Sequence, residues 1–303
     1  MNYFVLMAQA NALLFLFLLL GVVIKRLGVV TDDGQKGILS LSLNVALPAM
    51  IFMSFDMPVT PELLRNGGLA ILLGAIVKIT MFFLGKLLWG KKAPFARQAV
   101  LRACVLIPNT GMAGLPLVYA VFGQEALFYA ALYMVPQRFT TWSLGVSLFR
   151  PKGSKSAIRD LLLNPGIAAV WAGLIYMLLP VHLPAFLLEG IDVIGATAAP
   201  LAIISVGCIL AEVNIKTALE KDVLFLTAIR LLAIPLLVFL AFSPFSIPPT
   251  LLVSAVILSA MPVGLNVVLF AKQWDGDYVF AAKCLFVSSV LSLLSLPLLT
   301  LLF

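Results

Sequence analysis

The chain alternates between long apolar stretches and short polar segments. A helix needs about 20 residues to cross the hydrocarbon core of a bilayer, which is about 30 Å thick. The charge-free stretch between Asn2 and Lys25 predicts one such helix at residues 5–24, and a second lies between Lys36 and Asp56. The remaining stretches of this kind are residues 67–89, 103–124, 126–149, 165–181, 193–211, 223–242, 250–272 and 278–300. The pattern predicts an all-α integral membrane protein with ten transmembrane helices.

The composition agrees with a chain that lies mostly in lipid. Of the 303 residues, 62% are hydrophobic and 11% are charged, against roughly 45–50% and 25% in soluble domains. These values exclude a soluble enzyme and a disordered chain. Cys104, Cys208 and Cys284 lie in apolar stretches without CxxC spacing or a neighbouring His, so we interpret them as small apolar residues of the core.

The distribution of positive charge predicts the orientation in the membrane. If the N-terminus is outside, 16 of the 20 Lys and Arg residues fall in the inner loops, which satisfies the positive-inside rule. With ten spans, the C-terminus is then outside as well. The net charge of +7 is explained by this orientation, and no nucleic-acid partner is expected.

The two halves of the chain, residues 1–152 and 153–303, carry similar landmarks in the same order. Pro48 corresponds to Pro200 and Lys78 to Arg230, and Pro- and Gly-rich breaks recur at residues 108–116 and 261–266. Each half has five predicted spans, an odd number, so the second half enters the membrane from the opposite side. Such a 5+5 inverted repeat is typical of secondary transporters.

Corresponding spans of the two halves contain residues that interrupt a helix. The predicted helix-break residues are Pro108, Gly111, Gly114 and Pro116 in span four, and Pro262 and Gly264 in span nine. A helix that restarts inside the membrane presents unpaired N–H groups and a partial positive charge, which together bind anions. Asn109, Thr110 and Asn266 add polar side chains at this depth. The pattern predicts a binding site where these two spans meet.

Three cationic side chains lie within predicted spans. Lys78 and Arg230 either reach the headgroups, cap backbone carbonyls or contact substrate, and the sequence leaves these alternatives open. Arg138, beside Gln137, is expected to have a functional role. No Asp or Glu is placed near the middle of a predicted span, so the site is expected to hold an anion.

Asn44, four residues before Pro48, has two alternative roles. Its side chain either bonds carbonyls that the proline leaves free, or lines the substrate path.

The segments LNVALP (residues 43–48), NTGMAGLP (109–116) and MPVGLN (261–266) resemble the auxin efflux carrier family, within the bile acid/arsenite/auxin-like transporter superfamily. The resemblance implies a fold similar to sodium/proton antiporters, with spans four and nine broken and crossed. It implies a scaffold of spans one, two, six and seven and a transport domain of spans three to five and eight to ten. It also implies elevator-type movement, a homodimer through the scaffold, and carboxylates held near Asn109, Pro116, Pro262 and Asn266.

The loop at residues 150–164 is short, which resembles prokaryotic members of the family rather than plant auxin exporters. The expected location is therefore a bacterial inner (plasma) membrane, with both termini periplasmic.

The expected function is secondary transport of a small mono- or dicarboxylate, without a cofactor. The alternatives are a sodium- or proton-coupled symporter of the bile-acid type and, less favoured, a channel or non-transporting sensor. An enzyme is not expected, because the chain has neither an intramembrane Asp pair nor a Ser partner for its single histidine, His182. The nine substrate-binding candidates are Asn44, Asn109, Thr110, Gly111, Pro116, Gln137, Arg138, Pro262 and Asn266. No catalytic or metal-binding residues are assigned, and the coupling ion is left open.

Overall fold

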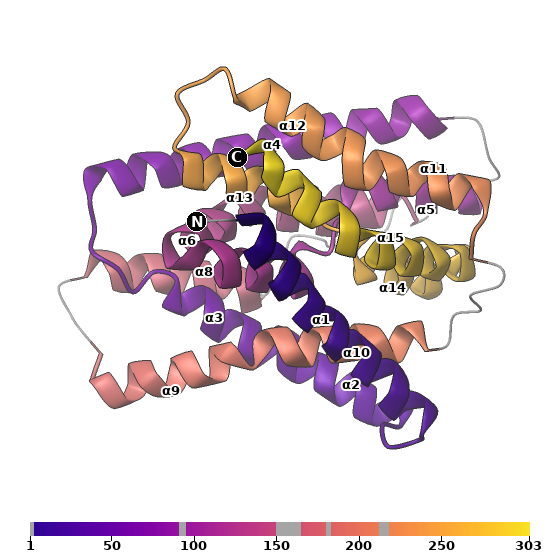
Figure 1. Ribbon diagram of the computed structural model, residues 1–303, viewed down its shortest axis with the longest axis horizontal. Helices are drawn as coiled ribbons and strands as arrows, with labels where there is room; N and C mark the ends of the chain where they lie inside the picture. Colours follow the sequence, from indigo (N-terminus) through magenta and orange to yellow (C-terminus); the bar gives the residue numbers. More distant parts are fainter. Residues whose placement is uncertain (1–2, 91–94, 150–164, 180–182, 212–217) are drawn as a thin grey trace.

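The computed structural model describes residues 3–90, 95–149, 165–179, 183–211 and 218–303, and these residues form helices without strands (Figure 1). The α-helices are α1 (Tyr3–Arg26), α2 (Asp32–Leu41), α3 (Leu47–Met53), α4 (Pro61–Trp89), α5 (Phe95–Leu106), α6 (Leu115–Thr140), α8 (Pro165–Leu178), α9 (Ala185–Ala196), α10 (Ala198–Leu210), α11 (Lys221–Ala228), α12 (Ile234–Phe242), α13 (Pro249–Ser259), α14 (Leu265–Gln273) and α15 (Tyr278–Leu299). The π-helical turns are η1 (Ser42–Ala46), η2 (Thr110–Gly114), η3 (Thr141–Gly145) and η5 (Ile229–Ala233), and a 3₁₀ turn, η6 (Thr300–Leu302), follows α15. The predicted loop at residues 150–164, the boundary between residues 152 and 153, and His182 lie outside the described residues.

Seven helical stretches in the described part of the chain are long and apolar enough to cross a membrane. They are Tyr3–Arg26, Asp32–Met53, Pro61–Trp89, Thr110–Gly145, Ala185–Leu210, Lys221–Phe242 and Tyr278–Leu302. The helices α8 and α13 are apolar but shorter. The prediction of an all-α, multi-pass membrane protein is confirmed. Ten spans were predicted from the sequence. In the structure, the helices within residues 103–124 and 250–272 are interrupted, and residues 165–181 contain only the short α8. The stretch Thr110–Gly145 covers parts of two predicted spans and bends at Gly123, which has a non-helical backbone (φ 79°).

A widened helical turn precedes three of the prolines. In η2, the N–H of Leu115 donates to the carbonyl of Thr110, five residues back, and Pro116 follows. The same bond joins Leu47 to Ser42 before Pro48, and Ile234 to Ile229 before Pro235. Proline has no N–H and its ring crowds the preceding turn, and a π-helical turn accommodates it without ending the helix.

The helices pack into two groups. In the first, α1 lies against α10, and α3 packs on α8 and α9; in the second, α4 and α13 pack on α6, and α5, α11 and α14 pack on α15. Gly21 and Gly207 allow α1 and α10 to touch, since a Cβ atom on either would lie 3.0 Å from the Cα of the other. The groups meet where α1 contacts α6 and α15, and where α10 contacts η2.

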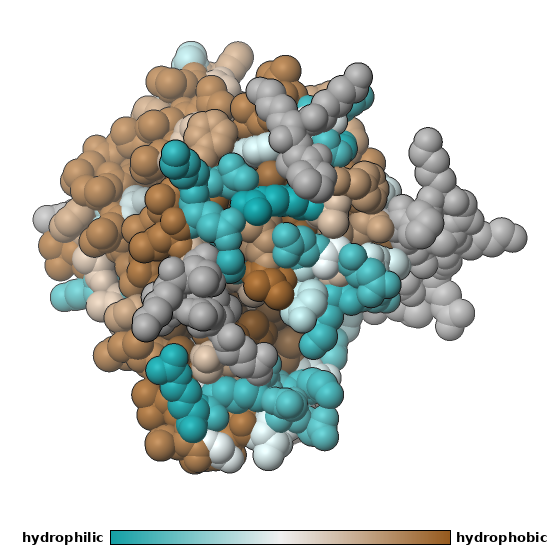
Figure 2. Space-filling view, turned by 90° about the vertical axis from the view of Figure 1, so that its right-hand side faces the viewer, coloured by the Kyte–Doolittle hydropathy of each residue, from teal (hydrophilic) through white to brown (hydrophobic). Residues whose placement is uncertain are grey.

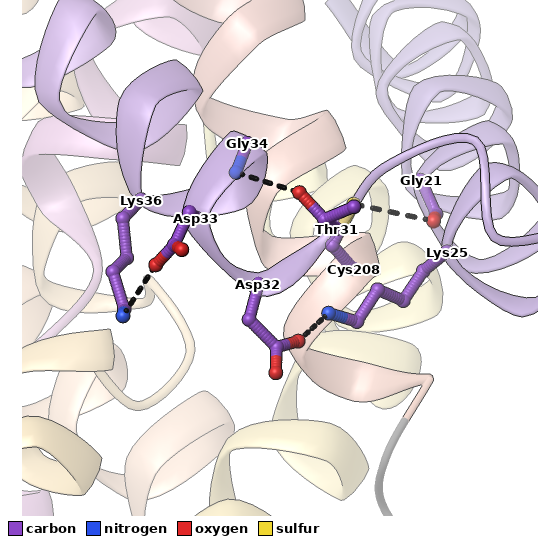
Figure 3. Close-up of polar contacts among 8 residues, drawn as sticks. All are labelled: Gly21, Lys25, Thr31, Asp32, Asp33, Gly34, Lys36 and Cys208. Atoms are coloured by element: carbon purple, nitrogen blue, oxygen red, sulfur yellow. Dashed lines mark hydrogen bonds and ion pairs between the residues drawn. The ribbon is translucent and has the colours of Figure 1, made fainter.

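One end of the molecule is polar. Figure 2 shows the end at which α1 finishes and α11 begins, with hydrophilic residues gathered over its middle and hydrophobic residues along its flanks. Part of it is the turn between α1 and α2, where Lys25 pairs with Asp32 and the Thr31 hydroxyl accepts the N–H of Gly34 at 3.1 Å (Figure 3). Nearby, the Cys208 thiol donates to the carbonyl of Gly21 at 3.3 Å. Cys104, Cys208 and Cys284 are all buried.

An ion-pair cluster joins α5, α11 and α15 in the second group. Arg97 lies 2.6 Å from Glu220 and 3.1 Å from Asp222, and Lys283 lies 2.5 Å from Glu220. The Arg97 guanidinium also lies over the ring of Phe280, 4.0 Å from its centroid. Hydrogen bonds from Lys283 and Arg97 lower the pKa of Glu220 below its ordinary value of 4.5.

Candidate functional site

The interruptions of two helices lie directly against each other. α5 ends at Leu106 and η2 begins at Thr110, while α13 ends at Ser259 and α14 begins at Leu265. Between them, Pro108 and Val263 face each other in a short antiparallel bridge. The N–H of Asn109 donates to Pro262 O at 2.8 Å, and the N–H of Gly264 donates to Ile107 O at 2.9 Å. Each interruption therefore satisfies backbone groups of the other, as a membrane interior requires.

This close pairing depends on glycine at position 264. A Cβ atom there would lie 2.9 Å from the carbonyl oxygens of both Ile107 and Pro108, which are backbone atoms that cannot rotate away. A Cβ on Gly114 would meet side-chain atoms instead, at 2.8 Å from Leu258 Cδ2. A side chain is thus less easily accommodated at position 264 than at position 114.

The buried cations Lys78 and Arg230 donate to carbonyls at the interruptions. Arg230 is 1% exposed, and it donates from Nη1 to Val105 O and from Nε to Met261 O, both at 3.0 Å. Lys78 is 2% exposed, and its Nζ lies 3.5 Å from Leu106 O. The ends of α5 and α13 carry partial negative charge, which these cations offset. Among the alternatives left open by the sequence, this is the carbonyl-capping arrangement.

A cavity of about 190 Å³ opens on one side of the crossing. Seven of the nine substrate-binding candidates line it: Asn44, Asn109, Thr110, Gly111, Gln137, Arg138 and Asn266. Pro108 and Gly264 also line it, whereas Gly114, Lys78 and Arg230 are not among its lining residues. The structure therefore gathers residues from three distant parts of the chain around one space.

The other two candidates, Pro116 and Pro262, face different spaces. Pro262 lines a cavity of about 40 Å³ between α1, α10 and α15, which Asn109 also lines. Pro116 lines a cavity of about 450 Å³ together with Asp56 and Asp192. Asn109 thus lies between two cavities, and Pro116 is separated from both.

Several polar groups that line the 190 Å³ cavity are hydrogen-bond donors. The first residues of η2 and of α14 both line it, and N–H groups in the first turn of a helix have no partner within that helix. The Gln137 amide donates to the Thr110 hydroxyl and, at 3.4 Å, to Pro108 O, and its own Oε1 is buried without a partner. Arg138 supplies the one cationic side chain among the described lining residues, and these include no Asp or Glu. The described side chains that line the cavity therefore carry a net positive charge.

Some lining residues of the cavity were not predicted from the sequence. Thr141 and Trp142 follow Arg138 by about one helical turn and face the same space, and Met112 and Met134 contribute apolar surface. The helical spacing from Arg138 was the available signal for Thr141 and Trp142. Asn44 donates to the hydroxyl of Ser40 at 3.0 Å, and the structure gives it no bond to a carbonyl freed by Pro48.

Helices long enough to cross a membrane, together with a polar cavity beside two helix interruptions, are typical of transporters. The family model described as "Membrane transport protein" matches residues 6–160 and 154–300. The chain belongs to this family, the auxin efflux carrier family.

Two relatives are similar over nearly their whole length. An uncharacterized transporter of Methanothermobacter thermautotrophicus is 27% identical over 296 residues, covering 92% of this chain and 93% of the relative. An uncharacterized transporter of Methanocaldococcus jannaschii is 22% identical over 296 residues, covering 94% of this chain and 95% of the relative.

Proposed function

We propose that this protein is a secondary transporter of small organic anions, and that the 190 Å³ cavity at the crossing is its substrate site. The observation that carries the proposal is the convergence of two helix N-termini and Arg138 on one cavity whose described lining residues include no carboxylate. Oriented N–H groups and a guanidinium are the donors that bind carboxylates in proteins. The volume suits a small mono- or dicarboxylate.

We further propose ten spans in a 5+5 inverted repeat. Here α5 with the first part of α6 forms span four, α13 with α14 forms span nine, and α8 represents span six. The packing supports a division into a scaffold of α1–α3 and α8–α10 and a transport domain of α4–α6 and α11–α15. The cavity takes Leu43, Asn44, Leu47 and Pro165 from the scaffold and its other lining residues from the transport domain. An elevator movement of one group against the other would change the access to such a cavity.

The polar end of the molecule supports an orientation with that end in the cytoplasm and both termini outside, in the plasma membrane. Association as a homodimer through the scaffold stays a prediction, which light scattering on the purified protein tests.

The test is a thermal-shift screen against acetate, benzoate, malonate and succinate, each paired with its neutral amide, with and without sodium. Stabilisation by a carboxylate but not by its amide supports an anion site, since a ligand at 100 times its Kd stabilises by about 2.7 kcal/mol. Counterflow uptake into proteoliposomes then separates a carrier from a channel. Absence of a shift with every carboxylate, or stronger binding of the amides, would refute the proposal.

A further inference from the structure

The guanidinium of Arg138 lies directly on the backbone of Gly166, at the start of α8. A Cβ atom on Gly166 would lie 2.5 Å from Cζ and 2.8 Å from Nη1 of Arg138, and closer still to Nη2. Real Cβ atoms essentially never come within 3.0 Å of a non-bonded heavy atom, so the flexible end of the Arg138 side chain would have to shift. The guanidinium therefore occupies the space that any side chain at position 166 would need.

This contact joins the two groups of helices at the wall of the cavity. Arg138 lies in the last turn of α6, in the second group, whereas α8 packs on α3 in the first. Pro165, the neighbour of Gly166, lines the cavity together with Arg138. The Arg138 guanidinium, which belongs to the second group of helices, is thus held against Gly166 of the first group.

We propose that Gly166 is a positioning residue that sets where the Arg138 charge lies in the cavity. The inference rests on the proposed function, in which this cavity binds an organic anion. Because Arg138 is the one cationic side chain among the described lining residues, its distance from the two helix N-termini determines how well they act together on one anion. Because Gly166 is on α8, a movement of α6 along α8 separates Arg138 from Gly166 and changes the affinity of the cavity for an anion. Substrate affinity and the relative position of the two groups are thereby coupled.

The first test is Gly166→Ala in the full-length protein, measured by calorimetry with the four carboxylates and their amides. The added methyl must displace the guanidinium, and losing a hydrogen bond from a charged group lowers affinity on the order of 10- to 100-fold. We expect the affinity for a carboxylate to fall about tenfold or more, while the affinity for an amide changes less than about twofold. The matched control is Gly190→Ala in α9, where an added Cβ meets nothing within 4 Å. Equal carboxylate affinities in Gly166→Ala and Gly190→Ala would overturn the inference.

A double-mutant cycle with Arg138→Lys separates positioning from a general structural role. Lysine lacks the planar guanidinium that occupies the space beside Gly166, and its compact ammonium group is carried on a flexible four-carbon stem. In the Arg138→Lys background, Gly166→Ala should therefore change carboxylate affinity less than about twofold. A further loss equal to that in the Arg138 background would contradict the inference.

The cycle also works without ligand. If Gly166→Ala lowers thermal stability or prevents folding because of the guanidinium, Arg138→Lys should restore it. If Arg138→Lys does not restore stability, the inference that Gly166 positions the Arg138 guanidinium is overturned. A wild-type protein that binds none of the carboxylates would refute the proposed function. The thermal stabilities of the two single variants and the double variant, measured without ligand, would still decide whether Gly166 positions Arg138.

Discussion

Asn109 donates its backbone N–H to the carbonyl oxygen of Pro262 at 2.8 Å, although the two residues belong to opposite halves of the chain. The bond uses the main chain of Asn109 and leaves its side-chain amide unused, and Asn109 lines two cavities beside the crossing. One residue thus serves the fold through its backbone and is available for ligand through its amide.

Asn109→Ala should lower carboxylate affinity at least about tenfold and leave the protein folded. The side-chain donor is lost, and hydrogen bonds to charged groups contribute about 1.5–3 kcal/mol, whereas the backbone bond to Pro262 remains. Calorimetry measures the affinity, and circular dichroism checks the fold. Thr80→Ala, on the exposed face of α4, is the control. Unchanged affinity in Asn109→Ala would count against this site.

Arg138→Gln should weaken carboxylates selectively. Removing the cation from the cavity should reduce their affinity by about 10- to 100-fold, because a charge-assisted bond is replaced by a neutral one. Neutral amides should bind with nearly the same affinity as before. Parallel titrations with each acid and its amide make the comparison, and an equal loss for both would refute an electrostatic role.

Arg230→Met should destabilise the protein strongly. The substitution leaves the carbonyls of Val105 and Met261 buried without their donor, and each such group costs about 1–3 kcal/mol. Lys78→Met should cost less, because its bond to Leu106 O is longer, at 3.5 Å. Thermal unfolding in detergent measures both, with exposed Arg65→Gln as the control. If Arg230→Met unfolds at the wild-type temperature, the guanidinium is not needed to cap these carbonyls.

Gly264→Ala should destabilise the crossing by about 1–3 kcal/mol, the usual cost of forcing extra atoms into a packed interior. The added Cβ would lie 2.9 Å from two backbone carbonyl oxygens. Gly68→Ala in α4 is the matched control, because a Cβ there meets nothing within 4 Å. Denaturation of the two variants side by side gives the difference, and equal stability would show that the backbones separate easily.

Glu220→Gln should flatten the dependence of stability on acidic pH. The pKa of Glu220 is lowered in the folded protein, so its contribution is present above pH 4.5 and is lost as the pH falls through the lowered pKa. The carboxylate is partly exposed, so the contribution should stay below about 1 kcal/mol. Unfolding temperatures between pH 6 and pH 3 measure it. A wild-type curve parallel to that of Glu220→Gln would show that the cluster adds nothing.

Much of the architecture follows from local sequence. Apolar length predicts helices of membrane span, because an apolar helix long enough for the bilayer has few alternatives in lipid. Pro108 and Gly264 predict where helices are interrupted, because proline lacks an N–H and glycine permits close backbone approach. The unusual polar residues Asn109, Gln137, Arg138 and Asn266 could be selected as candidates for the same local reason.

Tertiary structure decided which of these residues share a space. Pro116 and Pro262 belong to the same motifs as Asn109 and Asn266, yet they line other cavities, because side chains a few residues apart point in different directions around a helix. Likewise, no sequence motif indicated which carbonyls Arg230 binds or that Arg138 contacts Gly166. Such contacts join segments far apart in the chain, and only the packing of the helices brings those segments together.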